Sequence, residues 1–234
     1  MSVFVATSAG NAADAVPREA RVRTTGVLRV CIWPGYYAIS FRNPRNGLLE
    51  GIDIDLSRAL AESLGARVEH VMSGFGSFVD DLAGDRCDVA MFGIGVTAAR
   101  AERVDFSTAY LRSGIYAVAA TTNRRIRTWA DIDRLGVVVA VQAGTFMEPV
   151  MRDYLKQATI SIVRSPQTRE DEVLSGRADV FATDYPYSRR MLFQHEWARV
   201  IEPPEPIAPT PYAYAVARGQ PDWLAVIDRF VETV

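Results

Sequence analysis

The stretch formed by residues 88–107 constrains the fold of this chain more than any other. It opens with an apolar run at 89–92, which has no polar face and is typical of a strand buried on both sides. Gly93 and Gly95 then interrupt the run, and glycine allows the backbone to approach a ligand closely. A strand that ends in such a turn is the usual ligand-facing end of an open α/β sheet. The stretch therefore predicts an α/β fold with a binding site at this turn.

Arg100 follows this turn directly. Thr97 is the expected N-cap of a short helical segment that carries the arginine. Most arginines lie on the protein surface, so an exposed helical position is the simpler interpretation. A guanidinium group at the end of a buried strand, however, offers a planar set of donors that matches a carboxylate at two points. Its position favours a role for Arg100 in ligand binding.

Strand and helix patterns alternate twice along the chain, which predicts parallel sheets covered by helices on both faces. The expected strands lie at 27–33, 67–72, 89–92, 137–141, 160–163 and 178–182. We predict an α/β fold with two lobes, joined by two crossing strands. The first lobe would comprise residues 24–115 and 208–234, the second residues 116–207, and residues 1–23 would form a loosely ordered leader.

The composition excludes several functional classes. The net charge of −2 gives no electrostatic reason to expect nucleic acid or an anionic membrane as a partner. No spacing of cysteine and histidine suggests zinc, and no glycine-rich phosphate loop is present, so we expect neither a metal nor a cofactor. No apolar run reaches the length of a membrane-spanning helix. Residues 1–16 lack the features of an export signal, so either the signal has been removed or the protein is not exported.

The two cysteines, Cys31 and Cys87, are too few for a disulfide scaffold. Cys31 lies in the apolar run of the first expected strand, and Cys87 immediately precedes the strand at 89–92. We favour two unpaired thiols, with a single bridge between neighbouring strands as the alternative.

Two motifs resemble a known family. The pattern Thr-x-x-Arg at 97–100, followed by Val-Asp-Phe-Ser at 104–107, is similar to the signature of periplasmic solute-binding proteins of polar amino-acid ABC importers. Gly-x-Asp-x-Asp-Leu at 51–56 is a second match, and the resemblance extends from Gly26 to the C-terminus. It implies the type II periplasmic binding fold, a small-molecule ligand, an ABC permease as partner, a periplasmic location and a monomer. The family continues with one more helix, which this sequence does not contain after Val234.

The resemblance also implies roles for individual residues. Arg100 would hold the α-carboxylate of an amino acid, together with Thr145 of a Gly-Thr-x-x-Glu segment. Independently of the family, we expect Thr145 at a helix N-terminus, which attracts anions. Asp184 is expected to be an N-cap, and in the family this position accepts the ligand ammonium group.

Aromatic residues would cover the ligand side chain. By resemblance these are Phe75 first, and then Tyr36 or Tyr37, although aromatics are more often part of the core. Gly95 stands where many family members carry serine or threonine, and Phe92 where alanine or serine is common. The amine site would therefore have fewer side-chain acceptors, and carboxylates other than simple α-amino acids stay open as ligands.

An enzymatic alternative exists on the same fold. The cyclohexadienyl dehydratases, which act on prephenate or arogenate, resemble this chain at 110–112 and 182–184. Their general acid is a glutamate three residues after the aspartate, whereas this chain has Tyr187 there. A phenol with a pKa near 10 is a poor proton donor for that step. We therefore predict ligand capture without catalysis, and keep the dehydratase as the alternative.

Overall fold

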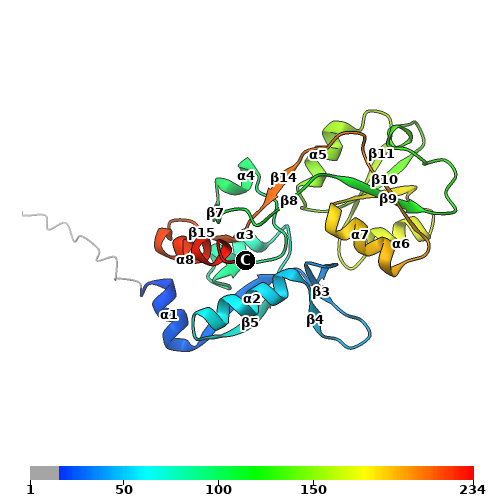
Figure 1. The fold of residues 1–234 in the computed structure, drawn as a ribbon. Coiled ribbons are helices and arrows are strands. Elements are labelled where there is room, and N and C mark those ends of the chain that lie inside the picture. The colour runs from blue at the N-terminus through cyan, green and yellow to red at the C-terminus, as the bar shows by residue number, and fades with distance from the viewer. Residues whose placement is uncertain (1–15) are drawn as a thin grey trace, which may run out of the picture.

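The computed structural model describes residues 16–234, which form two five-stranded sheets at opposite ends of the molecule (Figure 1). The first sheet has the order β5-β1-β6-β15-β7. Its strands are β1 (Val27–Ile32), β5 (Arg67–Met72), β6 (Val89–Ala90), β7 (Val104–Phe106) and β15 (Ala215–Ala217). β5, β1 and β6 are parallel, whereas β15 pairs antiparallel with β6 and β7.

The second sheet has the order β11-β10-β12-β9-β13. Its strands are β9 (Tyr116–Ala120), β10 (Val138–Gln142), β11 (Thr159–Val163), β12 (Val180–Thr183) and β13 (Ala198–Ile201). β10 is parallel to both β11 and β12, and β9 runs antiparallel to β12 and β13. In both sheets, the parallel strands follow the predicted strand–helix alternation.

Two strands connect the sheets. β8 (Leu111–Ser113) and β14 (Thr210–Tyr212) pair with each other antiparallel and run between the two ends of the molecule (Figure 1). After β8 the chain is interrupted at Gly114 and continues as β9 of the second sheet. The lobe boundaries at 115/116 and 207/208 stay predictions.

Helices cover both faces of each sheet. On the first sheet, α1 (Arg18–Thr25), α2 (Ile52–Ser63) and α8 (Pro221–Val231) pack on one face, and α3 (Phe78–Ala83) packs on the other. On the second sheet, α5 (Met147–Tyr154) packs on one face, and α6 (Arg169–Leu174) and α7 (Tyr185–Gln194) pack on the other. The short elements are β2 (Gly35–Tyr36), β3 (Ser40–Arg42), β4 (Leu49–Glu50), α4 (Ala98–Ala101) and the 3-10 turn η1 (Trp129–Asp131).

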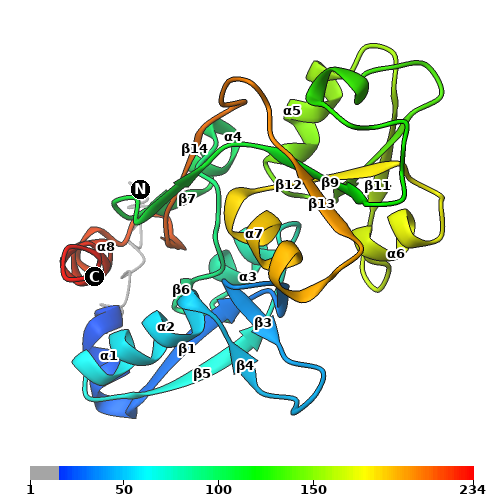
Figure 2. The same ribbon diagram turned by 45° about the vertical axis from the view of Figure 1, so that its right-hand side comes forward.

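The small sheet β2-β3-β4 lies next to α7 of the second lobe (Figure 2). The ring of Tyr37, from the β2–β3 connection, meets the ring of Tyr187 on α7 at a centroid distance of 5.5 Å. Tyr36 and Ile39 are buried in the same apolar cluster as Phe181 of β12. The two lobes are therefore packed together along this edge.

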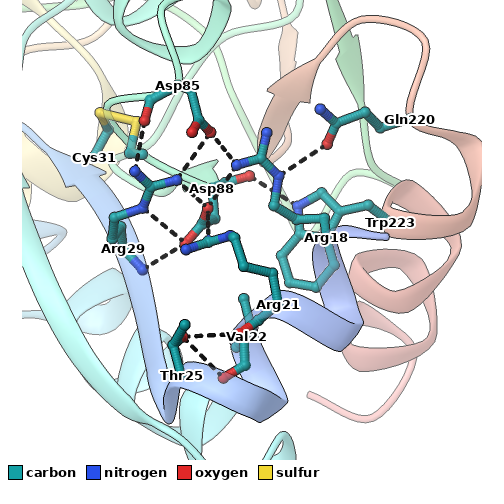
Figure 3. Close-up of polar contacts among 11 residues, drawn as sticks. Arg18, Arg21, Val22, Thr25, Arg29, Cys31, Asp85, Asp88, Gln220 and Trp223 are labelled. Carbon is teal, nitrogen blue, oxygen red and sulfur yellow. Dashed lines mark hydrogen bonds and ion pairs between the residues drawn. A yellow bond between two sulfur atoms is a disulfide. The ribbon is translucent and has the colours of Figure 1, made fainter. Parts of the chain in front are cut away.

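Part of the predicted leader is ordered, which corrects the sequence-based expectation for residues 18–23. These residues belong to α1, whose Val22 is fully buried against the first sheet. Arg18 and Arg21 of α1 both pair with the buried carboxylate of Asp88, which Arg29 of β1 also contacts at 2.8 Å (Figure 3). Asp88 lies 67 residues beyond Arg21, so local sequence could not reveal this partner. The leader predicted for residues 1–15 lies outside the described residues.

Cys31 and Cys87 form a disulfide, so the favoured prediction of two unpaired thiols is wrong. Cys31 lies in β1, and Cys87 lies two residues before the start of the adjacent parallel strand β6. Strand pairing brings their Cα atoms to 5.6 Å, which is within the range that a disulfide can bridge.

Candidate ligand-binding site

Arg100 lies at the junction of the two lobes. Thr97 caps α4 as predicted, because its side chain accepts a hydrogen bond from the Arg100 backbone N–H at 3.3 Å. The guanidinium donates to the carbonyl oxygen of Gly95 at 2.7 Å and, across the junction, to that of Gly144 at 2.8 Å. It also lies over the rings of Phe75 and Phe78, at 5.8 and 5.3 Å from their centroids.

The charge of Arg100 has no carboxylate partner in the part of the chain that the structure describes, since both of its side-chain hydrogen bonds go to backbone carbonyls. Burial lowers the pKa of Arg100 to about 10, which still leaves the group charged at neutral pH. A buried cation without a counter-charge is costly, and an anionic ligand would remove that cost.

Thr145 lies close to Arg100, because it directly follows Gly144. Its hydroxyl donates to the Gln142 carbonyl oxygen at 2.9 Å, and the side chain is 7% exposed. Thr145 lies near the N-terminus of α5 but is not its N-cap, because the helix begins at Met147 and its N-cap is Phe146, one residue after Thr145. The structure thus brings Arg100 and Thr145 together, but the hydroxyl of Thr145 is directed back into its own turn.

Asp184 is the N-cap of α7, as predicted. Its carboxylate is fully buried and accepts hydrogen bonds from the Tyr187 backbone N–H at 3.1 Å, the Tyr212 hydroxyl at 2.8 Å and the Tyr36 hydroxyl. Burial raises the pKa of Asp184, and the bonds from the two tyrosines only partly oppose this. Because Tyr36 belongs to the small sheet and Asp184 to the second lobe, their hydrogen bond crosses the junction.

An aromatic cluster fills the junction. The ring of Phe75 lies 5.2 Å from that of Trp33 and 5.8 Å from that of Tyr36. Tyr37, the other predicted tyrosine, turns away from this cluster and stacks on Phe41 at 4.1 Å. The structure therefore places Phe75 and Tyr36 together and places Tyr37 elsewhere.

The aromatic cluster leaves a cavity of only about 10 Å³ between the lobes, which is room for roughly one water molecule. Its lining residues are Trp33, Tyr36, Phe75, Gly93, Thr145, Phe146, Met147, Arg169 and Thr183. The protein's own side chains thus fill the centre of the junction, whereas two more open pockets, of about 290 and 580 Å³, are lined by residues of both lobes.

The two predicted glycines make this tight packing possible. Gly93 has a φ of +64°, and a Cβ atom there would lie 2.7 Å from the Tyr36 ring. At Gly95 a Cβ atom would lie 2.9 Å from the ring of Phe146, which belongs to the opposite lobe. A serine or threonine at position 95 would therefore displace Phe146.

Asp53 supports the site from beneath. Its buried carboxylate accepts hydrogen bonds from the Gly93 backbone N–H at 2.7 Å, the Tyr110 hydroxyl at 2.7 Å and the Tyr214 hydroxyl at 3.0 Å. Burial raises the pKa of Asp53 to about 6, although these three donors oppose the shift. Asp53 is the first aspartate of the Gly-x-Asp-x-Asp-Leu motif, so the motif fixes the glycine turn before Arg100.

Sequence reasoning missed Arg169 and Thr183. Both are buried and both line the cavity. The sequence contained one signal for Arg169. It lies four residues before the apolar Val173, and this spacing places both residues on the same, buried face of α6.

Residues 16–234 contain no helix that is long and apolar enough to cross a membrane. Nor does that range contain three or more histidine, cysteine, aspartate or glutamate side chains grouped so that they could hold a metal ion.

Comparison with known proteins identifies the family. Residues 28–234 match the model of the bacterial extracellular solute-binding proteins, family 3. The chain belongs to this family. Family 3 proteins bind a solute, so the substrate-binding role predicted from the sequence motifs is confirmed at this level.

Individual relatives include both binding proteins and an enzyme. Cyclohexadienyl dehydratase of Pseudomonas aeruginosa is 32% identical over 201 residues, which cover 86% of this chain and 75% of the enzyme. The L-cystine-binding protein TcyJ of Escherichia coli is 27% identical over 164 residues, which cover 70% of this chain and 61% of that protein. The second match thus spans less than two thirds of the relative's own length.

Solved structures of family 3 type confirm the fold. An ancestral amino acid-binding protein, described as a precursor of cyclohexadienyl dehydratase, has a TM-score of 0.83 at 29% identity, with 92% of both chains covered. An ancestral arginine-binding protein bound to glutamine has a TM-score of 0.80 at 28% identity, covering 89% of this chain and 91% of that one. The predicted type II periplasmic binding fold is therefore correct.

Proposed function

We propose that this protein is the extracytoplasmic binding component of an ABC importer and that it captures an amino acid or a related small carboxylate between its lobes. The observation that carries this proposal is the environment of Arg100. It is a charged, partly buried guanidinium that reaches across the lobe junction, yet its side-chain hydrogen bonds go only to the carbonyl oxygens of Gly95 and Gly144. A carboxylate is a stronger partner for that group than a carbonyl, because the hydrogen bonds would then be charge-assisted on both sides.

The proposed mechanism is capture by closure. The ligand carboxylate would take the place of the Gly144 carbonyl at Arg100, with Thr145 beside it. An ammonium group, where the ligand has one, would replace the Tyr36 hydroxyl at Asp184. Phe75 and Tyr36 would cover the ligand side chain. Since groups from both lobes contact the ligand, binding would favour the closed arrangement over the open one.

The disulfide supports a location outside the cytoplasm. Disulfides persist in oxidising compartments such as the bacterial periplasm and are rare in the cytosol. The bond between Cys31 and Cys87 therefore fits an exported protein. We propose a periplasmic or cell-surface location, with a monomer docking on a membrane permease as the functional encounter.

The substitution Arg100→Ala tests the carboxylate site. We expect it to weaken binding of a carboxylate ligand about 100-fold or more, since a buried ion pair would lose one partner. The measurement is isothermal titration calorimetry, after a thermal-shift screen of amino acids and related carboxylates has identified a ligand. The matched control is Arg103→Ala, because Arg103 is an exposed arginine that pairs with Asp80 at 2.6 Å on the surface.

Equal affinity in Arg100→Ala and in the parent would remove Arg100 from the site. A protein that retains its fold but shows no stabilisation by any amino acid or carboxylate would contradict the importer proposal as a whole.

A dehydratase activity is the second candidate, because a carboxylate lies next to Tyr187. The hydroxyl of Tyr187 donates to Glu170, which thus reaches the region where the related enzymes carry their glutamate. Tyr187 itself is no acid catalyst: burial and the nearby Glu170 charge raise its pKa well above the usual value of 10. Incubation with prephenate tests this candidate. Formation of phenylpyruvate that disappears in Glu170→Gln would establish it, and unchanged prephenate would eliminate it.

A further inference from the structure

A second buried arginine faces the same cavity as Tyr36 and Phe75. Arg169, the first residue of α6, is 3% exposed and lines the space between the lobes. Its guanidinium lies over the ring of Tyr187 at 4.4 Å and over that of Phe181 at 5.2 Å. These two rings fix the plane and the position of the group.

The hydrogen-bonding capacity of Arg169 is largely unused. One terminal nitrogen donates to the Ala182 carbonyl oxygen at 2.9 Å. Among residues 16–234, the buried Nε has no partner. A guanidinium has five N–H donors, and buried donors are normally satisfied, so this group lacks acceptors.

Thr183 has the same deficit at the same cavity. Its side chain is 1% exposed, and within the described chain its hydroxyl oxygen has no hydrogen-bond partner. Thr183 follows Ala182, the residue that accepts from Arg169, and it lines the cavity together with Arg169. Two unpartnered buried polar groups on one wall indicate that the wall is built to meet acceptor atoms.

The carboxylates nearby are already engaged by other groups. Asp184 accepts from the hydroxyls of Tyr36 and Tyr212 and from a backbone N–H, and Glu170 accepts from the hydroxyl of Tyr187. Neither carboxylate forms an ion pair with Arg169 in the part of the chain that the structure describes. Burial acts to lower the pKa of Arg169, but the neighbouring Tyr187 and Glu170 offset this and leave the pKa raised, so the group stays charged.

The groups of a neutral amino acid would therefore leave the unpartnered donors of Arg169 and Thr183 unused. A ligand carboxylate would neutralise Arg100, and a ligand ammonium group would neutralise Asp184. Arg169 and Thr183 would still lack acceptors, although the nearby charges of Glu170 and Asp184 help to stabilise the Arg169 cation. A second carboxylate of the ligand would supply acceptor oxygens at this wall.

We propose that Arg169 and Thr183 bind a second carboxylate of the ligand, so that the preferred ligand is a small dicarboxylate. This inference rests on the proposed function, because it assigns the first carboxylate to Arg100. Arg169 lines the small cavity of about 10 Å³ and also a neighbouring pocket of about 290 Å³, which Trp33, Gln142 and Tyr187 share. Of these two spaces, the neighbouring pocket is the one large enough for a small ligand.

The test compares ligands of nearly equal size by isothermal titration calorimetry on the purified protein. The amine-bearing dicarboxylates are L-glutamate and L-aspartate, and the amine-free ones are 2-oxoglutarate and succinate. L-glutamine and L-arginine serve as ligands with one carboxylate. We expect at least one dicarboxylate to bind about tenfold or more tightly than the matching monocarboxylate, since one additional charged pair contributes on this scale.

The substitution Arg169→Met then removes the charge and retains an unbranched side chain. Dicarboxylate affinity should fall about 100-fold, while monocarboxylate affinity changes less than about threefold. Arg177→Met is the control, because Arg177 follows the same helix and pairs with Glu172 at 2.9 Å on the surface. Should Arg169→Met fail to fold, Arg169→Lys keeps the charge but loses the planar set of donors, and the dicarboxylate preference should shrink in this variant as well.

The outcomes separate the two proposals. Equal binding of L-glutamate and L-glutamine to the parent would overturn the second carboxylate site and leave the importer proposal intact. A dicarboxylate preference that survives in Arg169→Met would overturn it too. Absence of any carboxylate binding, in the parent and in the variants, would contradict both proposals. Preference for amine-free over amine-bearing dicarboxylates would support Arg169 and remove Asp184 from ligand binding.

Discussion

Single charged groups that are partly or fully buried define the chemistry of the lobe junction. Arg100, Arg169 and Asp184 surround the lobe junction, and Asp53 lies beneath the glycine turn. Each is held by tyrosine hydroxyls, aromatic rings or backbone groups rather than by an ion pair of opposite charge. The ionisation of such groups is sensitive to burial and to bound ligands, because their charged forms have lost the stabilisation that water supplies.

Asp53 gives a prediction about pH. Its pKa in the folded protein is about 6, above the ordinary value of 3.8, so the folded state holds the proton more tightly than the unfolded state. The associated stability is fully present below pH 4 and is lost as the pH rises through 6, by about 3 kcal/mol. Asp53→Asn, which keeps an acceptor for Gly93 and Tyr110, should remove this dependence. Urea unfolding of both proteins between pH 4 and pH 7.5 measures it, and parallel profiles would contradict the assignment.

Among the secondary-structure elements, β1 and β6 are joined both by hydrogen bonds and by a covalent bond. The disulfide between Cys31 and Cys87 closes a segment that contains α2, β5 and α3. It therefore restricts a large part of the first lobe in the unfolded chain.

Removal of this disulfide should destabilise the protein. For the double variant Cys31→Ala/Cys87→Ala, the sequence separation of 56 residues predicts a loss of about 4 kcal/mol in the free energy of unfolding. Chemical denaturation provides the measurement. A reducing agent should have a similar effect on the parent and none on the variant. If it changes neither, the cysteines are not bonded to each other in solution.

The elements differ in how far the sequence could predict them. Some features depend on neighbours in the chain and were predicted correctly: the strand–helix alternation, the N-caps Thr97 and Asp184 and the glycine turn. Other features depend on partners that only strand pairing and helix packing bring close. These are the formation of helix α1, the disulfide and the burial of Arg169. Tyr36 and Tyr37 show the limit: adjacent residues of one type point to different sides, and the sequence offered no basis to choose between them.

The whole molecule is closed by a few polar contacts across the lobe junction. Two of these are the hydrogen bond from Tyr36 to Asp184 and the one from Arg100 to the Gly144 carbonyl. Both hydrogen bonds use protein groups to which we assign a role in ligand binding. A ligand would therefore exchange one set of bridging bonds for another instead of creating them anew.

Tyr36→Phe should shift the ligand-free protein toward an open arrangement, because it removes one bridging hydrogen bond and leaves the packed ring in place. Small-angle X-ray scattering would detect this as a larger radius of gyration, which returns to the parent value when ligand is added. Tyr154→Phe is the control: the hydroxyl of Tyr154 accepts from Trp129 at 2.8 Å within one lobe. Identical scattering from the parent and Tyr36→Phe without ligand would show that this hydrogen bond does not hold the lobes together.

The placement of the first and last helices has a practical consequence. α1 and α8 pack against the same sheet and lie at the end of the molecule away from the second lobe (Figure 1). A fluorescent protein or a surface linker attached beyond either helix would be fixed to the first lobe. Two such labels would therefore not report a movement of the second lobe. An optical sensor built from this protein would need its second label inside residues 116–207, at an exposed position such as Leu135 or Phe193. The same geometry makes α1 and α8 suitable for immobilisation, since attachment to a bead or chip there leaves the second lobe unattached.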